Sequence, residues 1–237
     1  MKIEILGTGC MWTKYNSASY LINESIMVDF PNGTCKYLYR KDIEPYKVNH
    51  ILITHFHGDH YFDIPFYILN KSKKDKKESF IYCSEEGIEK INLLGNLAFP
   101  NSFNEAFSSI PVTYNTNNSF NINDYYIERI LVDHGRMKPA YGYIFKKDNI
   151  YVGFTGDSKL CDNIYLMASK CNYLFIDCMF LEGNDKHMGI DNLIDLIKLY
   201  PSCKYIVTHL EDETRNKLQE LNLKNVIVPT DYQTILI

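Results

Sequence analysis

The chain has 237 residues, 46% of them hydrophobic, and a formal net charge of −4. A chain of this length buries a substantial core, and we expect one domain spanning residues 1–237. The acidic balance and a pI near 6.0 argue against a protein whose whole surface is adapted to a long nucleic-acid backbone.

The first half of the chain is predicted to be rich in β-strands. Runs of β-forming residues, separated by Gly, Asn and Ser, predict strands at residues 2–6, 19–23, 26–30, 50–54 and 79–84. Helical spacing of apolar residues predicts helices after Pro31 and at residues 59–69 and 85–96. Residues 96–124 contain many Asn and Ser and two prolines, so we expect mainly loop there.

In the second half of the chain, predicted strands recur with helices. The predicted strands cover residues 125–134, 141–147, 150–156, 173–178, 204–209, 225–228 and 234–237. Helices are predicted near residues 161–169 and 211–221, and between them a helix carries Ile190, Leu193, Ile194 and Ile197 on one face. This order predicts an α/β fold in which two sheets are flanked by helices.

The cysteines indicate a reducing compartment. All seven are scattered, with no C-x-x-C pair, which is not the pattern of a disulfide framework. The opening MKIEILGTG passes directly into a strand-like alternation, and no apolar run approaches the 18 residues that indicate a membrane span. We therefore expect a cytoplasmic protein with reduced thiols and no membrane partner.

One basic run stands out, KSKKDKK from Lys71 to Lys77, with five lysines and one aspartate. Such runs are usually solvated loops, and this is our interpretation. The alternative is a face that binds nucleic acid or protein in a catalytically inactive scaffold.

The segment HFHGDH, from His55 to His60, concentrates three histidines and an aspartate directly after a predicted strand. Burying four polar, titratable groups together without a metal is costly, so the segment predicts a metal site. Neutral imidazole and carboxylate suit Zn, Mn or Fe, and the lack of nearby cysteine ligands argues against a structural zinc finger.

The spacing within this segment offers ligands in two directions. Alternate residues of an extended chain point to the same side, so His55 and His57 are placed to hold one ion. Asp59 begins the next helix and His60 faces elsewhere, so this pair is placed to hold a neighbouring ion. Gly58 permits the tight turn between the two pairs.

Further candidate ligands lie at the ends of later predicted strands. His134, Asp157 and His209 end or follow such strands, and strand ends at one edge of a sheet face a common crevice. With the early cluster they would hold two ions about 3.5–4 Å apart, Asp157 bridging them, which predicts hydrolytic chemistry. A lone histidine such as His50 is better explained as a hydrogen-bonded structural residue.

With these motifs the chain resembles the metallo-β-lactamase superfamily, whose H-x-H-x-D-H signature is present here as HFHGDH. The opening is similar to the ribonuclease Z branch, and later segments follow in the order of that branch, namely LVDHG, GYIF, FTGDS, IDCMFLEGNDKHMG and IVTHL. The resemblance implies an αββα sandwich of two mixed β-sheets flanked by helices. It also implies two divalent metal ions, Zn or Mn, and a homodimer, which is common among the relatives.

The resemblance also implies a role for each candidate residue. The ligands of the first metal are expected to be His55, His57 and His134. The ligands of the second are expected to be Asp59, His60 and His209, with Asp157 bridging the two ions. Asp59 is further expected to orient the nucleophilic water. His187 is expected to contact the scissile phosphate and to help protonate the leaving oxygen.

The sequence departs from ribonuclease Z in two places. It has DCMF and HMG where that branch has a Glu-Ala-Thr-Phe stretch and a His-Ser-Thr triplet. Asp157 follows His134 by only 23 positions, enough for two hairpin strands, whereas ribonuclease Z inserts its tRNA-binding arm in this interval. The arm is therefore predicted to be missing.

Without the arm, an acidic protein has little means of holding a long nucleic acid, because phosphate contacts supply most of that affinity. We expect hydrolysis of a small or cyclic phosphodiester, such as a cyclic or short nucleotide. Armless relatives include cyclic phosphodiesterases, among them phage-type enzymes that degrade cyclic mononucleotide signals. Some of the 19 tyrosines and 13 phenylalanines would then offer a stacking surface for a base.

Other functions are compatible with the same site. One alternative is ribonuclease Z-type processing of RNA 3′ ends, and another is hydrolysis of an ester, thioester or lactam by the same metal centre. A redox di-iron protein is disfavoured by His57, because that branch has glutamate at the second histidine of the motif.

Overall fold

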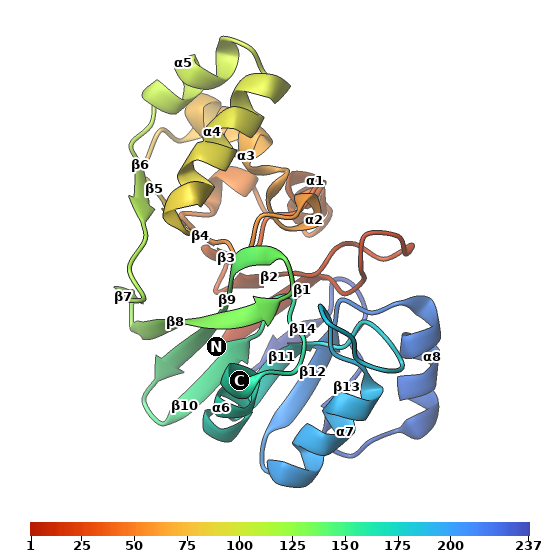
Figure 1. Cartoon of the computed structure of the whole chain (residues 1–237). Helices are drawn as coiled ribbons and strands as arrows, with labels where there is room; N and C mark the ends of the chain where they lie inside the picture. Colours follow the sequence, from red (N-terminus) through yellow and green to blue (C-terminus); the bar gives the residue numbers. More distant parts are fainter. The chain divides into compact units, whose positions relative to one another are not determined.

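The structure is a computed structural model that describes residues 1–237, and it contains two compact units, each built on one β-sheet (Figure 1). Unit 1 comprises Met1–Gly7, Ser17–Thr116 and Asp231–Ile237, and unit 2 comprises Thr8–Asn16 and Asn117–Thr230. The chain therefore passes between the units four times. The single domain over residues 1–237 stays a prediction.

The sheet of unit 1 has seven strands in the order β14-β1-β2-β3-β4-β5-β6. These strands are β1 (Lys2–Gly7), β2 (Ser19–Ile22), β3 (Ile26–Val28), β4 (His50–Leu52), β5 (Ser79–Tyr82), β6 (Val112–Asn115) and β14 (Thr234–Leu236). Pairing is antiparallel from β14 to β3 and parallel from β3 to β6, so the sheet is mixed. The first and last strands of the chain, β1 and β14, are neighbours.

The helices of unit 1 are α1 (Thr34–Arg40), η1 (Pro45–Lys47), α2 (Gly58–Tyr61), α3 (Ile64–Lys74), α4 (Glu85–Ala98) and α5 (Ser102–Ser108). Helices α3, α4 and α5 contact one another (Figure 1). Gly95 of α4 permits this approach, because a Cβ atom there would lie 2.4 Å from the ring of Phe103. Tyr67, Ile91 and Phe103 are fully buried in the apolar core of the unit.

The sheet of unit 2 also has seven strands, in the order β13-β12-β11-β10-β9-β8-β7. These strands are β7 (Ser119–Ile122), β8 (Tyr125–His134), β9 (Met137–Lys147), β10 (Ile150–Phe154), β11 (Tyr173–Asp177), β12 (Lys204–Thr208) and β13 (Val226–Ile227). Strands β10 to β13 are parallel and strands β7 to β10 are antiparallel. This sheet is mixed as well.

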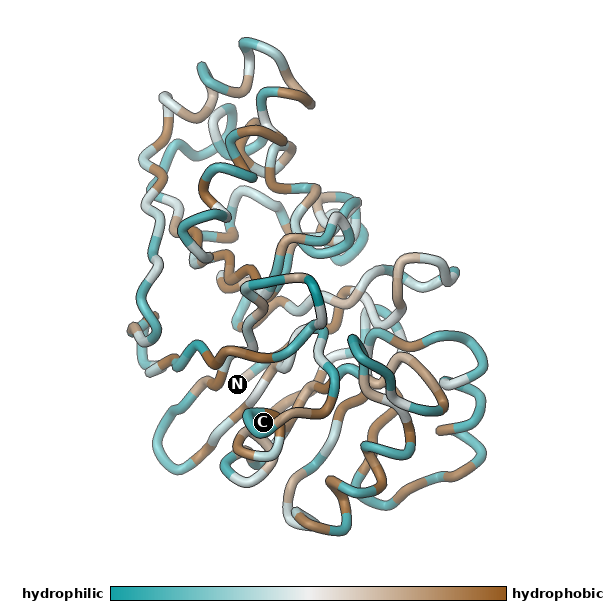
Figure 2. Tube along the Cα trace, viewed as in Figure 1, coloured by the Kyte–Doolittle hydropathy of each residue, from teal (hydrophilic) through white to brown (hydrophobic).

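The helices of unit 2 are α6 (Asp162–Lys170), α7 (Ile190–Leu199) and α8 (Asp212–Leu221). Figure 2 shows hydrophobic and hydrophilic residues alternating along α7. Ile190, Leu193 and Leu196 of that helix are buried in the core of the unit, as expected for an amphipathic helix that covers a sheet. Of the predicted face, Ile190 and Leu193 are buried, and Ile194 and Ile197 are partly buried against the same core; Leu196 was not predicted.

The prediction of an α/β fold with two mixed sheets flanked by helices is confirmed, although three local predictions were wrong. The helix predicted over residues 59–69 is two helices, α2 and α3. Proline favours the first turn of a helix because it has no backbone N–H to donate, and Pro65 lies in the first turn of α3. Residues 96–124, predicted as loop, contain α5, β6 and β7, which are too short for their apolar residues to show a clear period.

The basic run was the third error, because only part of it is a solvated loop. Helix α3 continues to Lys74, and the side chain of Lys71 is fully buried. Its Nζ donates hydrogen bonds to Tyr46 O at 2.9 Å and to Asn49 Oδ1 at 2.7 Å, and it lies 3.3 Å from Asp75 Oδ2. A buried ammonium group is tolerated when polar partners of this kind surround it.

Among the helices, none has both the length and the apolar character that crossing a membrane requires.

Candidate metal centre

The segment from His55 to His60 follows β4 and forms α2. Nε2 of His55 lies 3.0 Å from Nδ1 of His57, and Nε2 of His60 lies 3.8 Å from Oδ2 of Asp59. The ring centroids of His55 and His60 are 4.0 Å apart, so the two predicted pairs adjoin. His57 is partly exposed and the other three side chains are buried. We name these four residues the unit 1 cluster.

Asp29 forms hydrogen bonds to His60 of the unit 1 cluster and to Thr54 beside it. This supporting role was not predicted from the sequence. Its carboxylate accepts hydrogen bonds from Thr54 N and Oγ1, both at 2.8 Å, and from Nδ1 of His60 at 2.7 Å. Thr54 Oγ1 in turn lies 3.1 Å from Nδ1 of His55. Asp29 thus fixes one histidine directly and another through Thr54. Burial raises the pKa of Asp29, and its contact with His60 opposes that rise.

The position of Asp29 follows from the sheet. Strands β3 and β4 are parallel neighbours, so the residues after their ends lie at the same edge. Asp29 comes directly after β3 and has a φ of 59°, in the left-handed region that few residues other than glycine adopt. Aspartate and asparagine tolerate this region better than most side chains do.

A second cluster lies in unit 2. We define the unit 2 cluster as His134, Asp157, Asp177, His187 and His209, all of which except His187 are buried. Ligand atoms of Asp157, Asp177, His187 and His209 all lie within 4.8 Å of one another. Nε2 of His134 is 3.9 Å from Oδ2 of Asp157. The structure therefore brings together His134, Asp157, His187 and His209, which the sequence singled out, and adds Asp177.

The sheet of unit 2 explains this convergence. Strands β10, β11 and β12 are parallel and adjacent, and Asp157, Asp177 and His209 lie at or just after their C-terminal ends. Strand β8 ends at His134 and runs antiparallel to β9, which is itself antiparallel to β10, so β8 ends at the same edge. Carboxyl ends of strands at one edge are the usual location of sites in α/β proteins.

Asp177 orients His187. Oδ2 of Asp177 accepts a hydrogen bond from Nδ1 of His187 at 2.8 Å and another from Ser158 N at 3.0 Å. Burial acts to lower the pKa of His187, but the charge of Asp177 and this hydrogen bond outweigh it and raise the pKa. The ring of His187 stacks on that of His209, with centroids 5.1 Å apart. Asp177 thus fixes the ring orientation of His187.

Polar groups also lie close to His134 and His209. Nδ1 of His134 lies 3.0 Å from Lys186 O, and burial lowers the pKa of His134. Nε2 of His209 lies 3.3 Å from Oδ2 of Asp157, and its Nδ1 lies 3.7 Å from Oδ1 of Asp177. His209 has a φ of 59°, another left-handed conformation directly after a strand. Such backbone strain concentrates at functional sites.

Both clusters fit divalent metal ions. They consist of imidazole and carboxylate groups, mostly buried, with no cysteine among them, which suits Zn or Mn and not a structural thiolate site. A carboxylate behind His60 and another behind His187 fix ring orientations, as acidic residues near ligating histidines commonly do. The donor set therefore supports metal binding in each unit.

His50 lies where its structural interpretation requires. His50 stacks on Phe80 in β5, and its Nδ1 is 3.1 Å from Tyr82 Oη. Burial lowers its pKa to about 4, in keeping with a neutral structural histidine. Cys178, close in sequence to Asp177, is fully buried, and burial raises the pKa of its thiol, which makes it unreactive.

Comparison with known proteins gives the family. The sequence profile of the anti-Pycsar protein Apyc1 matches residues 1–230. The chain belongs to the Apyc1 family. Ribonuclease Z of Thermococcus kodakarensis is 32% identical to this Apyc1-family chain over 303 aligned positions, which cover 99% of this chain and 94% of the relative. That alignment has more positions than this chain has residues, so the relative contains segments with no counterpart here.

Solved structures agree on the fold. The metallo-beta-lactamase fold protein YhfI from Bacillus subtilis has a TM-score of 0.80 and 16% identity, covering 99% of this chain and 98% of that protein. Human tRNase Z, short form, has a TM-score of 0.75 and 17% identity, covering 100% and 99%. The Apyc1-family chain therefore has the metallo-β-lactamase fold and is a metallo-hydrolase similar to ribonuclease Z, as the sequence predicted.

Proposed function

We propose that this protein is a metal-dependent phosphodiesterase that hydrolyses a small or cyclic phosphodiester of a nucleotide. The observation that carries the proposal is the short interval between His134 and Asp157, which consists of the hairpin strands β9 and β10 and their turns. A chain with a net charge of −4 and no extension in this interval has no excess of positive charge with which to bind a long RNA. A compact substrate does not need such extended contacts to a phosphate backbone.

Two divalent ions, Zn or Mn, are the proposed cofactors. We assign the first to His55, His57 and His134, and the second to Asp59, His60 and His209, with Asp157 as the shared ligand. This assignment rests on the family resemblance and on the donor types found in each cluster. When bound, such ions supply a reactive water at neutral pH and positive charge for the phosphate oxygens.

The side chains of the protein then perform the proton transfers and the positioning. We propose that Asp59 orients the attacking water. Because Nδ1 of His187 is engaged by Asp177 at 2.8 Å, its Nε2 is the nitrogen that faces a substrate. We propose that this nitrogen donates a hydrogen bond to the phosphate and then passes its proton to the leaving oxygen. Asp177 is a positioning residue in this scheme.

The name of the family, anti-Pycsar protein, and the absence of the arm together favour a cyclic nucleotide as the substrate. The test is turnover of 2′,3′- and 3′,5′-cyclic mononucleotides and of bis(p-nitrophenyl) phosphate with Mn²⁺ or Zn²⁺. The Asp59→Ala variant should lose most of this activity, whereas Asp195→Ala, an exposed carboxylate paired with Lys198, should keep it. No turnover, or equal turnover by both variants, contradicts the proposal.

Processing of RNA 3′ ends is the second candidate, and the likeness to the Thermococcus ribonuclease Z favours it. A precursor tRNA assay separates the two functions, because an enzyme for compact substrates should cleave the cyclic nucleotide far faster than the precursor. A thioester or lactam tested beside them addresses hydrolysis of acyl substrates by the same centre.

Two further expectations are kept as proposals. The seven free cysteines favour a cytoplasmic location, where thiols stay reduced. A homodimer is proposed, and one candidate surface is the face of α4 that carries Leu93 and Leu97, which are 62% and 71% exposed. No long nucleic acid and no membrane is proposed as a partner.

A further inference from the structure

The loop Thr8–Asn16, drawn in red in Figure 1, belongs to unit 2, like the unit 2 cluster. Leu210 N donates a hydrogen bond to Thr8 O at 3.1 Å, and Cys10 N donates to Leu210 O at 3.4 Å. Leu210 directly follows His209. These two hydrogen bonds therefore connect the loop to the residue that follows His209, which is one of the proposed metal ligands.

Internal contacts hold this loop in one conformation. Gly9 N donates to Asn16 O at 2.9 Å and closes the loop at its base. The guanidinium group of Arg215 lies 3.9 Å from the ring centroid of Tyr15, and Nη2 of the same group donates to Thr8 Oγ1 at 2.8 Å. Arg215 is buried, so this anchor is shielded from solvent. A loop held in this way presents its outer side chains in fixed positions.

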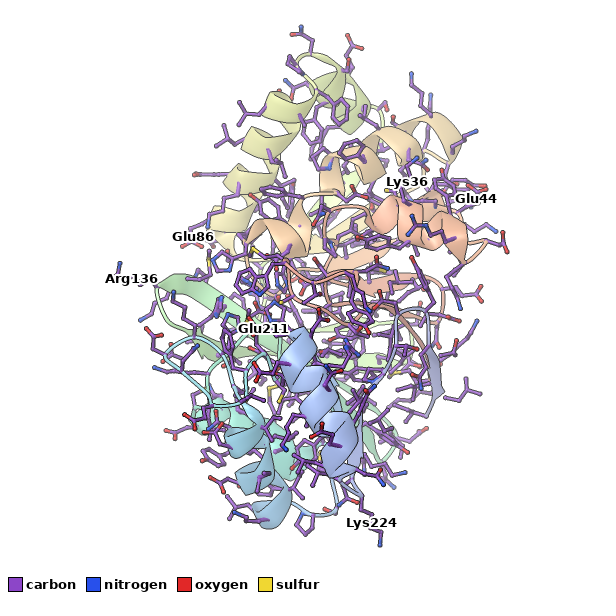
Figure 3. All side chains as sticks on the ribbon, turned by 90° about the vertical axis from the view of Figure 1, so that its right-hand side faces the viewer. Lys36, Glu44, Glu86, Arg136, Glu211 and Lys224 are labelled. Atoms are coloured by element: carbon purple, nitrogen blue, oxygen red, sulfur yellow. The ribbon has the colours of Figure 1, made fainter.

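Trp12 lies on this loop and is the only tryptophan of the chain. Its side chain is 62% exposed. Its Nε1–H donates to Oε1 of Glu211 at 2.9 Å, and Figure 3 shows Glu211 at the end of α8 where that helix begins. The hydrogen bond restrains the edge of the indole, and most of the ring stays open to solvent. Glu211 is two residues after His209, and the loop that carries Trp12 is hydrogen-bonded to Leu210. Both residues of this hydrogen bond are therefore held close to the strand end that carries His209.

We propose that Trp12 is the platform on which the base of the nucleotide substrate stacks. The inference rests on the proposed hydrolysis of a nucleotide and adds the residue that binds the part of the substrate that does not react. Aromatic side chains stack on all bases, so this contact favours any nucleotide over a base-free phosphodiester. Because Glu211 already restrains the indole, binding costs little further side-chain entropy.

Tryptophan fluorescence measures ligand binding at Trp12 directly, because Trp12 is the only tryptophan of the protein. Metal-loaded protein is titrated with a nucleoside 5′-monophosphate and, separately, with ribose 5-phosphate, which has the same phosphate and no base. Stacking should quench or shift the emission with the nucleotide and leave it unchanged with ribose 5-phosphate. An equal response to both ligands, or a response to neither, overturns the proposal.

Kinetics on cyclic nucleotides provide the second readout. Trp12→Ala should raise KM by roughly tenfold or more and change kcat much less, whereas Trp12→Phe should keep most of the affinity. Met11→Ala is the matched control, because Met11 is the neighbouring exposed apolar side chain and should leave KM unchanged. An unaltered KM in Trp12→Ala overturns the inference and leaves the proposed hydrolysis intact. Base-dependent quenching without any hydrolysis would instead support the platform and reject the proposed function.

Discussion

The carboxylate of Asp177 accepts a hydrogen bond from Nδ1 of His187 at 2.8 Å, although the two residues are ten positions apart in the chain. The contact requires that the loop after β11 return to the sheet edge, which it does through the bridge between Phe180 and Gly189. Asp177 also lies 3.7 Å from His209. One buried carboxylate thus fixes His187 and lies close to a second histidine of the unit 2 cluster.

The first prediction concerns this carboxylate. Asp177→Asn keeps the shape of the side chain and removes the charge that holds His187, so kcat should fall about 10- to 100-fold. Combining it with His187→Ala should lower kcat little further than His187→Ala alone, because both changes disable one unit. Steady-state kinetics of the two single variants and the double variant measure this. Fully multiplicative losses would show that Asp177 acts independently of His187.

A second prediction concerns Asp29, which stands behind the unit 1 cluster. In Asp29→Asn the amide group cannot reproduce all three acceptor contacts of the carboxylate, so the ring of His60 loses its fixed orientation. Metal affinity should fall by about tenfold or more, as measured by elemental analysis after dialysis against a weak chelator.

The control for this variant is Asp63→Asn. Asp63 is also a buried carboxylate of unit 1, but it accepts a hydrogen bond from Cys35 N at 2.7 Å, outside the unit 1 cluster. Its metal content should match that of the unmodified protein. Equal metal retention in both variants would remove Asp29 from the supporting role.

Asp29 and Asp177 also mark the limit of what the sequence predicted. The histidines were visible because three of them stand together in HFHGDH, and because His134, His209 and Asp157 end or follow clear strands. Asp29 and Asp177 also end or follow strands, in VDFP and FIDC. A single aspartate at a strand end is common, however, and only the pairing of β3 with β4 and the return of His187 to β11 give these two a partner.

The fold, too, has elements that were predicted from the sequence and elements that were not. Strand β8 was predicted with the correct bounds because buried and more exposed residues alternate along most of it. Strand β9 was predicted only from residue 141, although it begins at Met137. Helix α5 was missed, since it has seven residues and only Phe103 and Ala106 are buried. The basic run was misread because charge suggests solvent, whereas the acceptors of Lys71 come from distant parts of the sequence, Tyr46 and Asn49. Tertiary partners of this kind leave no local pattern.

His50 leads to a prediction about acid stability. Burial lowers its pKa to about 4, below the ordinary value of 6.5. Between pH 6.5 and 4 the unfolded chain binds a proton that the folded chain does not, so this residue destabilises the fold increasingly as the pH falls. His50→Gln should remove this contribution. Urea unfolding at pH 7.5 and pH 5 should show a smaller loss of stability for the variant, and identical losses would refute the assignment.

Introducing negative charge on α4 tests the proposed dimer surface. Leu93 and Leu97 are four residues apart on one face of α4, so glutamate at both positions would place two charges on that face. The double variant should be monomeric by light scattering at concentrations where the unmodified protein is dimeric. Leu199→Glu, at an equally exposed leucine of unit 2, should leave the dimer intact. A dimer that survives the α4 variant uses another surface.

The last prediction concerns the folding of the two units. Strand β14 completes the sheet of unit 1 by pairing with β1, yet the chain between these strands includes all of unit 2. We therefore expect unfolding in one cooperative transition, as for a single domain. Trp12 reports on unit 2 alone, whereas far-ultraviolet circular dichroism reports on the helices and strands of both units. Denaturation curves from the two signals should coincide, and a tryptophan transition clearly separated from the dichroism curve would show that the units unfold independently.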